Sequence, residues 1–555
     1  MYGFTVKYVK NFEQNPSAKN RFCFIEKIDG FTFVFENFQF QKFENDKIFK
    51  ENQDFIIGID GIVLNLNLLK KAYGISSFFD LIIHLYQQKG SHFFDIFKGE
   101  FCGFLFDKTK KELYFFNNKT ATKQIFYSQE KTEFIVSNSF HDVLDFKNEN
   151  TLNENAVFDM LSFGGMLENK TFVNSVYKLL AGEYICFKNQ NFSKEVYYDY
   201  NQIPISIFSK KDAIEKFDVA FKEAVVLEYE KDKEYQFQHF STLSGGLDSR
   251  MTLMLSQQMN YLSKTFCFSQ TGYADQKIAA QIAKDLNLEH EFIALNGSRY
   301  LLDLEKMVSI NAGLQNYNGS AHYSFALEHT NLSNFGLIHT GQIGDGLLGG
   351  LVTKDKNYLS KITTSKFLDK VQYEKNYRDE EIFKLYNRVF NLTNFGSLVV
   401  EAQQTYLVSP FFDSDVMEIG FSIDPKLKYN QNIYIDWINQ KHPETTKFVW
   451  ERTGFKPNSA WKTEFSRYTK KLESIYLKLA QKENLLSMTP DEYWFLKDKN
   501  LQSFYENFFN ENIELFSSNV YLYKELKTFY KQGNLTDKSN VLTILEAVRQ
   551  FGIEV

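Results

Sequence analysis

Residues 236–250 read QFQHFSTLSGGLDSR, and this stretch decides the fold of the second half of the chain. Its first eight residues have the aromatic and β-branched character of a strand, and a helical segment, MTLMLSQQM, follows directly. KTFCFS (264–269), DQKIAAQIAKDLN (275–287) and HEFIAL (290–295) then continue the alternation of strand and helix. Alternating strands and helices predict βαβ crossovers and a parallel sheet.

The SGGLDS turn, Ser244 to Ser249, lies where the strand passes into the helix. Two glycines let the backbone turn tightly and let phosphate oxygens approach its N–H groups, while hydroxyls and the helix N-terminus favour an anion. Asp248 would repel that anion unless a cation lay between them, so we expect it to bind Mg²⁺. A serine-capped βα turn without a ligand is the alternative, and the motif in its strand–turn–helix context disfavours it.

The first part of the chain reads differently. Short aromatic and β-branched runs, such as FTFVFENFQF (31–40) and EFCGFLFD (100–107), are broken by Gly, Asn, Asp and Lys. They predict layered antiparallel strands. Helical stretches at 76–90 and 153–165 make the predicted class α+β rather than a pure sandwich.

We place a domain boundary within residues 190–210, which lose periodicity, so the predicted domains are 1–200 and 201–555. Ser209, three residues before Asp212, has the signature of a helix N-cap. Apolar residues repeat behind it at helical spacing, namely Ile214, Phe217, Phe221 and Val225. A helix is therefore expected to open the second domain, which turns mostly helical beyond about residue 360.

Composition limits the function classes. The 555 residues are 43% hydrophobic and 24% charged, with 63 Lys and Arg against 69 Asp and Glu and a net charge of −6. No basic excess is available for nucleic acid or for an anionic membrane. The four cysteines, at 23, 102, 186 and 267, form no CxxC pair, which disfavours disulfides and zinc. We find no secretory signal and no apolar run of the roughly 20 residues that a bilayer span needs, and we expect a cytoplasmic protein.

The SGGLDS turn resembles the pyrophosphatase loop of the asparagine synthetase family, whose members adenylate a carboxylate with ATP and pass it to an amine. Segments similar to later motifs of the family follow in order, namely FCFSQTGYADQKIAAQIAKDLNLEHEFI (266–293), IHTGQIGDGLLGG (338–350), VSPFFDSDVMEIGFSIDP (408–425) and WERTGFKP (450–457). The resemblance covers residues 210 to about 465. It implies an α/β parallel-sheet ATP-pyrophosphatase domain with a helical C-terminal part.

The same resemblance implies the site and its cofactors, ATP and Mg²⁺. The residues implied in ATP binding are Leu243, Ser244, Gly245, Gly246, Asp248, Ser249, Phe268, Ser269 and Gly341, with Cys267 also in the adenine pocket. Asp345 stands in the position of the family's second Mg²⁺ ligand. Asp248 and Asp345 would thus act in catalysis through the metal ion.

Residues 1–200 resemble the family's first domain, a class II glutamine amidotransferase with an Ntn-type sandwich, through IDGIVLN (59–65) and KGEFCGFLFD (98–107). That activity needs an N-terminal cysteine nucleophile, and here Tyr2 stands at its position. Asp60 would put negative charge where an oxyanion must form. We therefore expect the domain to lack glutaminase activity and to serve as a scaffold.

The second domain also departs from the family pattern. Gln342 stands where the family has Glu, and an amide cannot act as a general base. A Lys that neutralises charge in the family lies early in the helix corresponding to NIYIDWINQKHPE (432–444), and no Lys occupies that early position here. Other lysines are open alternatives for this role, namely Lys428, Lys441, Lys456 and Lys462. For His322, ahead of the second glycine-rich motif, we favour a core or helix-surface role over contact with substrate.

The sequence therefore predicts an ATP-dependent amide-forming ligase that adenylates a small-molecule or peptide carboxylate and transfers it to ammonia or a substrate amine. Two alternatives stay open: a nucleotide-binding pseudo-enzyme, and a cyclase of the macrolactam or β-lactam type within the same family. A tRNA-modifying thiolase is disfavoured because a basic excess and paired cysteines are missing. We expect neither nucleic acid nor membrane as partner and leave a homodimer open.

Overall fold

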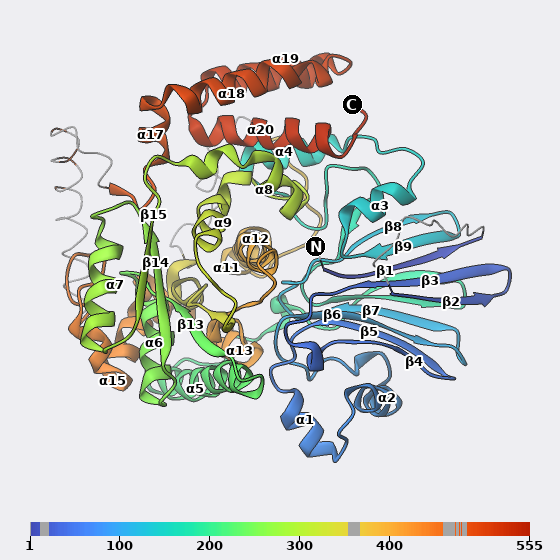
Figure 1. The fold of residues 1–555 in the computed structure, drawn as a ribbon, viewed down its shortest axis with the longest axis horizontal. Coiled ribbons are helices and arrows are strands. Elements are labelled where there is room, and N and C mark those ends of the chain that lie inside the picture. Colours follow the sequence, from blue (N-terminus) through green and yellow to red (C-terminus); the bar gives the residue numbers. More distant parts are fainter. Residues whose placement is uncertain are drawn as a thin grey trace.

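A computed structural model of the chain describes residues 2–10, 22–352, 367–458 and 486–555 and the single positions 472, 475, 477 and 479. Two layers of antiparallel strands lie at one side of the molecule, and a parallel sheet flanked by helices lies at the other (Figure 1). C-terminal helices lie across the top of this second part in that view. The fold is the α+β sandwich, parallel sheet and helical C-terminal part that the sequence predicts.

Two antiparallel sheets form the N-terminal sandwich. Within the described residues, the first has six strands in the order β10-β8-β9-β1-β3-β2, and the second has six in the order β12-β11-β7-β6-β5-β4. Their bounds are β1 Gly3–Val9, β2 Phe22–Ile28, β3 Phe31–Phe38, β4 Ile48–Glu51, β5 Phe55–Gly61, β6 Phe101–Asp107, β7 Glu112–Asn117, β8 Phe126–Glu130, β9 Glu133–Ser137, β10 Tyr177–Lys178, β11 Glu183–Lys188 and β12 Asn191–Val196.

Strand β5 shows why the sandwich strands read as nearly continuous apolar runs. Phe55, Ile57 and Ile59 pack on one face of the sheet against the helices that cover it. Ile56 points to the other face and packs against the first sheet. Since both faces are buried, both sets of alternating side chains are apolar.

Strand β12 corrects the expectation that residues 190–210 are irregular. It pairs with β11 in an antiparallel hairpin. Lys188 lies opposite Asn191 at the closed end, so the turn has two residues. Both turn residues, Asn189 and Gln190, have positive φ angles of 50° and 60°. A hairpin with this turn can form without the apolar alternation on which the sequence argument relied, because the β12 side chains are mostly exposed.

The α-helices that accompany the sandwich in the described part of the chain are α1 Leu66–Tyr73, α2 Phe78–Lys89, α3 Phe140–Phe146 and α4 Glu154–Phe163. The predicted helical stretches at 76–90 and 153–165 correspond to α2 and α4. Ser77 caps α2 by accepting a hydrogen bond from the Asp80 N–H. Side chains of α3 and α4 share a core with helices near the C-terminus and with Phe126 and Ile135 of the first sheet.

The second sheet is parallel and has the strand order β15-β14-β13-β16-β17 within the described residues. Its strands are β13 Gln238–Thr242, β14 Ser263–Ser269, β15 His290–Ala294, β16 Phe335–His339 and β17 Leu407–Val408. β13 lies at the centre, and the chain winds outward first on the β14 side and then on the β16 side. The winding therefore reverses between β13 and β16.

The helices of this part are α5 Lys210–Glu234, α6 Asp248–Gln258, α7 Ala274–Asp285, α8 Leu304–Asn311, α9 Ala321–Glu328, α11 Glu380–Lys384, α12 Phe390–Glu401, α13 Ser414–Ser422, α14 Pro425–Lys428, α15 Asn432–Lys441, α17 Asp491–Lys497, α18 Lys499–Asn512, α19 Val520–Gln532 and α20 Leu535–Gln550. As expected, a helix, α5, opens this part, and the Ser209 side chain caps it by accepting from the Asp212 N–H. α20 packs against α4, α8, α18 and α19.

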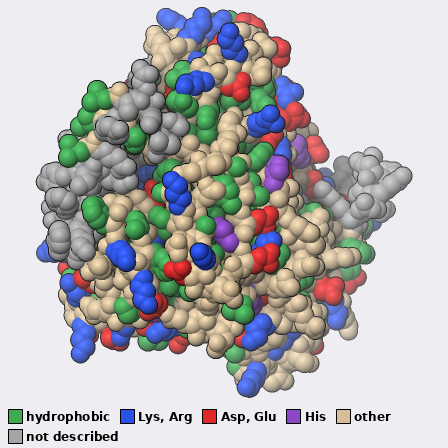
Figure 2. Space-filling model, turned by 60° about the vertical axis from the view of Figure 1, so that its left-hand side comes forward, with side chains coloured by type: hydrophobic (Ala, Val, Ile, Leu, Met, Phe, Trp, Pro, Cys, Tyr) green, Lys and Arg blue, Asp and Glu red, His purple; other side chains and the backbone are tan. Residues whose placement is uncertain are grey.

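The molecular surface carries charges of both signs. On the face shown in Figure 2, Lys and Arg side chains alternate with Asp and Glu outside the grey atoms, and no continuous basic field is visible there. Within the described ranges, every helix is too short or too polar to cross a membrane.

Helix α12 connects the two parts of the molecule. Its Asn394 side chain donates to the carbonyl oxygens of Thr120 and Ala121, at 3.3 and 2.9 Å. The Glu401 carboxylate lies 2.7 Å from Lys123 Nζ, which also lies 2.6 Å from the Asp60 carboxylate. Lys123 and Asp60 are 3% and 0% exposed in their side chains, so this charge triad is shielded from solvent.

We predict that Lys123→Met lowers the free energy of unfolding by about 3–5 kcal/mol, because it leaves two buried carboxylates without a cation. The triple variant Asp60→Asn/Lys123→Met/Glu401→Gln should recover most of that loss. Urea unfolding of the full chain measures both. Lys111→Met, at an exposed ion pair, is the control, and an equal loss in control and test would contradict the assignment.

Candidate active site

A cavity of about 680 Å³ opens where the chain leaves β13 and β16 for the loops that follow them. In open α/β sheets, ligands bind at the carboxyl ends of the strands where the winding reverses, and these two strands flank that point. The expected ATP-binding residues that line the cavity are Leu243, Ser244, Gly246, Asp248, Ser249, Phe268 and Gly341. Gln342, Asp345 and Cys267 line it as well.

Side-chain hydroxyls hold the SGGLDS turn in shape. Ser249 Oγ accepts from the Ser244 N–H at 3.1 Å, and the two hydroxyls lie 3.1 Å apart. Ser244 Oγ also accepts from the Gly246 N–H at 3.1 Å. The turn leads directly into α6, so the positive end of that helix faces the cavity.

Gly245 lies just behind the cavity wall, where a side chain has no room. An added Cβ would lie 2.7 Å from Glu451 Cβ and 2.9 Å from Asp275 Oδ1. Asp275, at the start of α7, accepts from the Gly245 N–H at 2.6 Å, and burial raises the pKa of its carboxyl to about 6. This glycine is therefore required for close packing of three segments.

The second glycine-rich loop touches the first. A Cβ on Gly341 would lie 2.1 Å from the Asp248 carbonyl carbon, and one on Gly344 would lie 2.8 Å from Asp248 Cγ. Between them, Ile343 has a φ of 64°, which is a strained conformation for a β-branched residue. The loop is thus bent so that Asp345 comes beside Asp248.

Asp248 is held on both carboxylate oxygens. The Asp345 N–H donates to Oδ2 at 2.9 Å, and the Tyr434 hydroxyl donates to Oδ1 at 2.7 Å. Burial, together with the nearby Asp345 carboxylate, raises the pKa of the Asp248 carboxyl to about 8. Two neighbouring carboxyl groups, one half-buried and one exposed, are suited to a hard divalent cation.

Arg452 is the cationic side chain that lines the cavity in the described part of the chain. Its Nη1 lies 3.8 Å from the Asp345 carboxylate and donates to Gln431 Oε1 at 3.0 Å, while 57% of the side chain stays exposed. The segment that carries Arg452 is anchored by Arg250 of α6. This buried guanidinium donates to Gly245 O at 3.0 Å and to Val449 O at 2.7 Å.

None of the described lysines proposed for the phosphates lines the cavity. Lys428 is buried and forms an ion pair with Glu381. Lys441 pairs with Glu215 at 2.6 Å, and Lys456 is exposed. Lys462 lies outside the described residues.

Aromatic residues form another part of the cavity wall. Phe268 stacks on Tyr323 with ring centroids 5.4 Å apart, and His322 lies beside them. Burial lowers the pKa of His322 to about 4, so this imidazole is neutral at physiological pH. Ser269, in contrast, is fully buried and its hydroxyl donates to Gln270 O, away from the cavity lining.

Gln342 lies on the cavity wall beside α12. Its Oε1 is buried without a hydrogen-bond partner among the described residues. A Cβ on Gly396 would lie 3.1 Å from its Nε2, so the amide packs directly on the helix. The side chain can orient a bound group but cannot take up a proton as a base.

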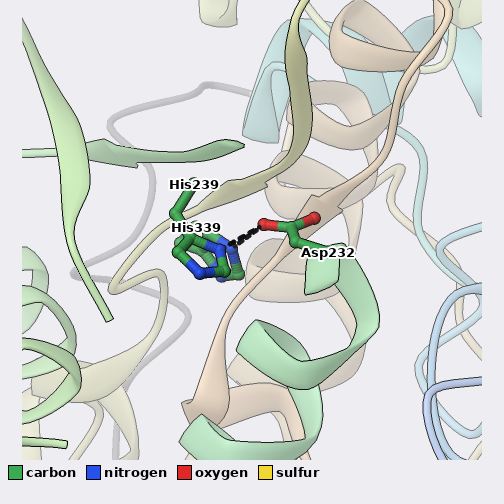
Figure 3. Close-up of side chains that lie close together, drawn as sticks. All are labelled: Asp232, His239 and His339. Carbon is green, nitrogen blue, oxygen red and sulfur yellow. Dashed lines mark hydrogen bonds and ion pairs between the residues drawn. The ribbon is translucent and has the colours of Figure 1, made fainter. Parts of the chain in front are cut away.

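A buried network underlies the second loop (Figure 3). His339 Nε2 and His239 Nδ1 both approach Asp232 Oδ2, at 2.8 and 2.9 Å, and Glu228 lies 3.3 Å from His339 Nδ1. Burial opposes a charged imidazole, but Tyr229, Asp232 and Glu228 raise the pKa of His339 well above its usual value. The donor atoms of Asp232, His239 and His339 lie within 4.8 Å of one another, as in a metal site. Because these groups already satisfy each other by hydrogen bonds, we interpret them as a charged hydrogen-bond network.

In the first domain, Tyr2 stands at the position of the family's nucleophile and is held by contacts with Glu401 and Phe40. The Tyr2 backbone N–H donates to Glu401 Oε1 at 3.1 Å, and the Tyr2 ring packs edge-on against Phe40. Asp60, which we expected to oppose an oxyanion, is instead paired with Lys123. Burial raises the pKa of the nearby Cys102 thiol to about 12, so it stays protonated.

Sequence reasoning missed Arg452, Tyr434, Asp275 and Arg250. Asp275 had a usable signal, because it begins the helix after β14 and the carboxyl ends of neighbouring parallel strands share one edge. Arg452 lies in the WERTGFKP segment that carries the resemblance. Tyr434 and Arg250 had no such signal, because their partners lie 186 and 195 residues away in the chain.

Comparison with known proteins identifies two families in the chain. Residues 45–198 match the family described as a glutamine amidotransferase domain, and residues 217–395 match the family described as asparagine synthase. The two matches follow each other in the order of the sandwich and the parallel-sheet part.

Individual relatives are distant. A protein of Methanocaldococcus jannaschii assigned as glutamine-hydrolysing asparagine synthetase 2 is 23% identical over 322 residues, covering 56% of this chain and 61% of the relative. The glutamine-hydrolysing asparagine synthetase 2 of Bacillus subtilis is 24% identical over 276 residues, covering 46% of this chain and 36% of the relative. The chain thus spans less than two thirds of either relative. Glutamine PRPP amidotransferase from B. subtilis overlaps 52% of this chain and 59% of its own at 10% identity and a TM-score of 0.23, too low to establish a shared fold.

We predict that His339→Gln lowers the free energy of unfolding by roughly 2 kcal/mol or more at pH 6, because Asp232 and Glu228 lose their shared cation. The folded pKa lies above the unfolded value of 6.5, so the stabilisation is complete below about pH 6.5 and is lost as pH rises through the folded pKa. Urea unfolding from pH 5.5 to 9 should show the gap between wild type and variant narrowing. Exposed His329→Gln is the control, and a gap that widens with pH would contradict a charged His339.

Proposed function

Because the chain belongs to the asparagine synthetase family, we propose that it is an ATP-dependent ligase that forms an amide. A carboxylate oxygen of the substrate would attack the α-phosphorus of ATP, and pyrophosphate would leave. The nitrogen of ammonia or of a substrate amine would then attack the acyl carbon, and AMP would leave with the bonding electron pair. The meeting of the two glycine-rich loops, which brings Asp345 against Asp248 at the cavity, carries this proposal.

Asp248 and Asp345 are the proposed Mg²⁺ ligands. Negative charge on the half-buried Asp248 is unfavourable beside a second carboxylate, and a divalent ion held by both would remove that penalty. When bound, the ion supplies positive charge for the phosphate oxygens. The Ser244 and Ser249 hydroxyls and the N-terminus of α6 would hold the departing pyrophosphate.

In this proposal, Arg452 neutralises the charge that the missing lysine neutralises in the family. It is exposed enough to reach an incoming phosphate, and its contact with Gln431 keeps it next to Asp345. A guanidinium there would stabilise negative charge that builds up on the phosphates during adenylation.

The lining of the cavity supports a proposal for the class of carboxylate. The charged lining residues within the described ranges gather around the SGGLDS turn, namely Asp248, Asp275, Asp345, Glu451 and Arg452. Elsewhere the wall is neutral, with Tyr323, Leu392 and Gly396. Among the described lining residues of this neutral part, an amino acid such as aspartate would find no counter-charge for its ammonium group. We therefore propose a carboxylate on an otherwise uncharged body.

The nitrogen is proposed to come from ammonia or from an amine, not from glutamine. A phenol stays protonated at neutral pH and is a poor nucleophile in place of a thiolate. The Tyr2 amide is also bonded to Glu401 and packed against Phe40. The first domain is proposed to act as a scaffold.

A nucleotide-binding pseudo-enzyme is the second candidate. Gln342 favours it, because the amide lies on the cavity wall and has no proton-accepting role. The paired carboxylates favour the ligase, because a protein without turnover has no need to hold Asp248 against the repulsion of Asp345. The two candidates predict different results in a single exchange assay.

We predict ATP–pyrophosphate exchange that depends on a carboxylate, tested across uncharged-body carboxylates alongside aspartate. Asp248→Asn should lower the exchange by about 100-fold or more, because it removes a metal ligand. Asp285→Asn, exposed at the end of α7, should leave it unchanged. Nucleotide binding without exchange on any carboxylate would support the pseudo-enzyme instead.

For Arg452 we predict that replacement by Met slows exchange by about 100-fold while ATP still binds, because the charge acts mainly in the transition state. Arg452→Lys should restore part of the rate, since it keeps the charge but not the guanidinium geometry. Lys456→Met, on the same segment but outside the cavity lining, is the matched control. Equal rates for the Met variant and wild type would exclude this role.

A further inference from the structure

A second, smaller cavity lies at the contact between the sandwich and the parallel-sheet part. Its volume is about 40 Å³, and the sandwich contributes Glu100, Asn118 and Thr120 to its wall. Glu228 of α5 and Ser409, which follows β17, line it from the other side. A space of this size holds a water molecule or a monatomic ion.

Glu100 is the unusual group in this wall. Glu100 is 6% exposed, and its Oε2 atom is buried without a hydrogen-bond partner among the described residues. Burial raises the pKa of this carboxyl to about 8, and the Thr122 hydroxyl only partly offsets the effect. A buried carboxyl oxygen without a partner is costly unless something in the cavity satisfies it.

The Glu228 carboxyl group also lacks a cationic partner of its own. Its partner is His339, at 3.3 Å, and this imidazole is shared with Asp232 at the shorter distance of 2.8 Å. Burial raises the pKa of the Glu228 carboxyl to about 7. Three carboxyl groups therefore line one small cavity, namely Glu100, Glu228 and Asp413. Asp413 is paired with Lys98, and Glu228 shares the His339 imidazole with Asp232, so Glu100 is the one without a bonded cation among the described residues.

The lysines that line the same cavity are engaged elsewhere. Lys98 donates to Asp413 and Asp415, at 3.1 and 2.6 Å. Lys119 lies 4.5 Å from the centre of the Tyr198 ring. No described lysine or arginine is thus bonded to Glu100.

We propose that this cavity binds a small monovalent cation, ammonium or potassium, between Glu100 and Glu228. Both ions carry one charge, are close to water in size and accept oxygen ligands, which the carboxyl groups and the Ser409 and Thr120 hydroxyls can supply. A hydrated Mg²⁺ ion needs more room, because it keeps most of its water ligands. The rival state is a protonated Glu100 beside a water molecule.

The ion would lie one layer behind the active-site loop. Ser409 Oγ donates to Gln342 O at 3.0 Å, and Glu228 contacts His339, three residues before Gln342. Occupancy is therefore expected to stabilise the folded chain and the second loop.

Thermal unfolding of the full chain in choline, sodium, potassium and ammonium chloride at one ionic strength tests the proposal. We expect potassium or ammonium to raise the midpoint over choline by about 2 °C or more, with saturation, since a ligand that binds only the folded state stabilises it. Glu100→Gln should abolish the difference, and exposed Glu511→Gln should keep it. Equal midpoints in all four salts, or an effect that survives Glu100→Gln, would overturn the site.

Crystals grown with rubidium or thallium give a direct test that does not depend on the variant folding. An anomalous peak between the two carboxyl groups supports the site, and a water molecule there refutes it. Competition by ammonium against the heavy ion distinguishes the two natural occupants. Neither measurement requires turnover, so the outcome is independent of the proposed ligase activity.

Discussion

The contact of Gly341 and Gly344 with the start of α6 is the constraint on which the rest of the site depends. A side chain at either position would overlap backbone or carboxylate atoms of Asp248. The strain at Ile343 is offset by the same contact, because the bent loop can then donate its Asp345 N–H to Asp248. Two carboxylates are thereby held together against their mutual repulsion.

A second constraint comes from Arg250, which has no charged partner among its hydrogen bonds. Its guanidinium is fully buried and donates to carbonyl oxygens of Gly245, Thr445, Phe448 and Val449. Burial lowers the pKa of this group to about 10, which is still far above neutrality. Arg250 in α6 thus anchors both the SGGLDS turn and the segment that brings Glu451 and Arg452 to the cavity.

Much of the fold was predictable because it depends on residue patterns that are local in the sequence. Alternating strands and helices, the glycine pair and the acid inside the turn predict the parallel sheet and place Asp248 at its carboxyl edge. The strand β12 was missed because an exposed hairpin strand carries no apolar alternation. The cationic group was sought among lysines, yet the structure places Arg452 at the cavity, because that contact depends on how residues 445–452 dock on α6. Ser269 was expected at the ATP site, yet it lies outside the cavity lining, because it is fully buried and its hydroxyl donates to Gln270 O.

Through helix α12, the packing of the first domain affects the shape of the cavity in the second. One side of this helix presents Leu392 and Gly396 to the cavity, while Asn394 and Glu401 are fastened to the sandwich. Any drift in the sandwich that shifts residues 120–123 would therefore move a wall of the pocket. Selection on the shape of this pocket would therefore also act on the sandwich, even at positions far from the cavity.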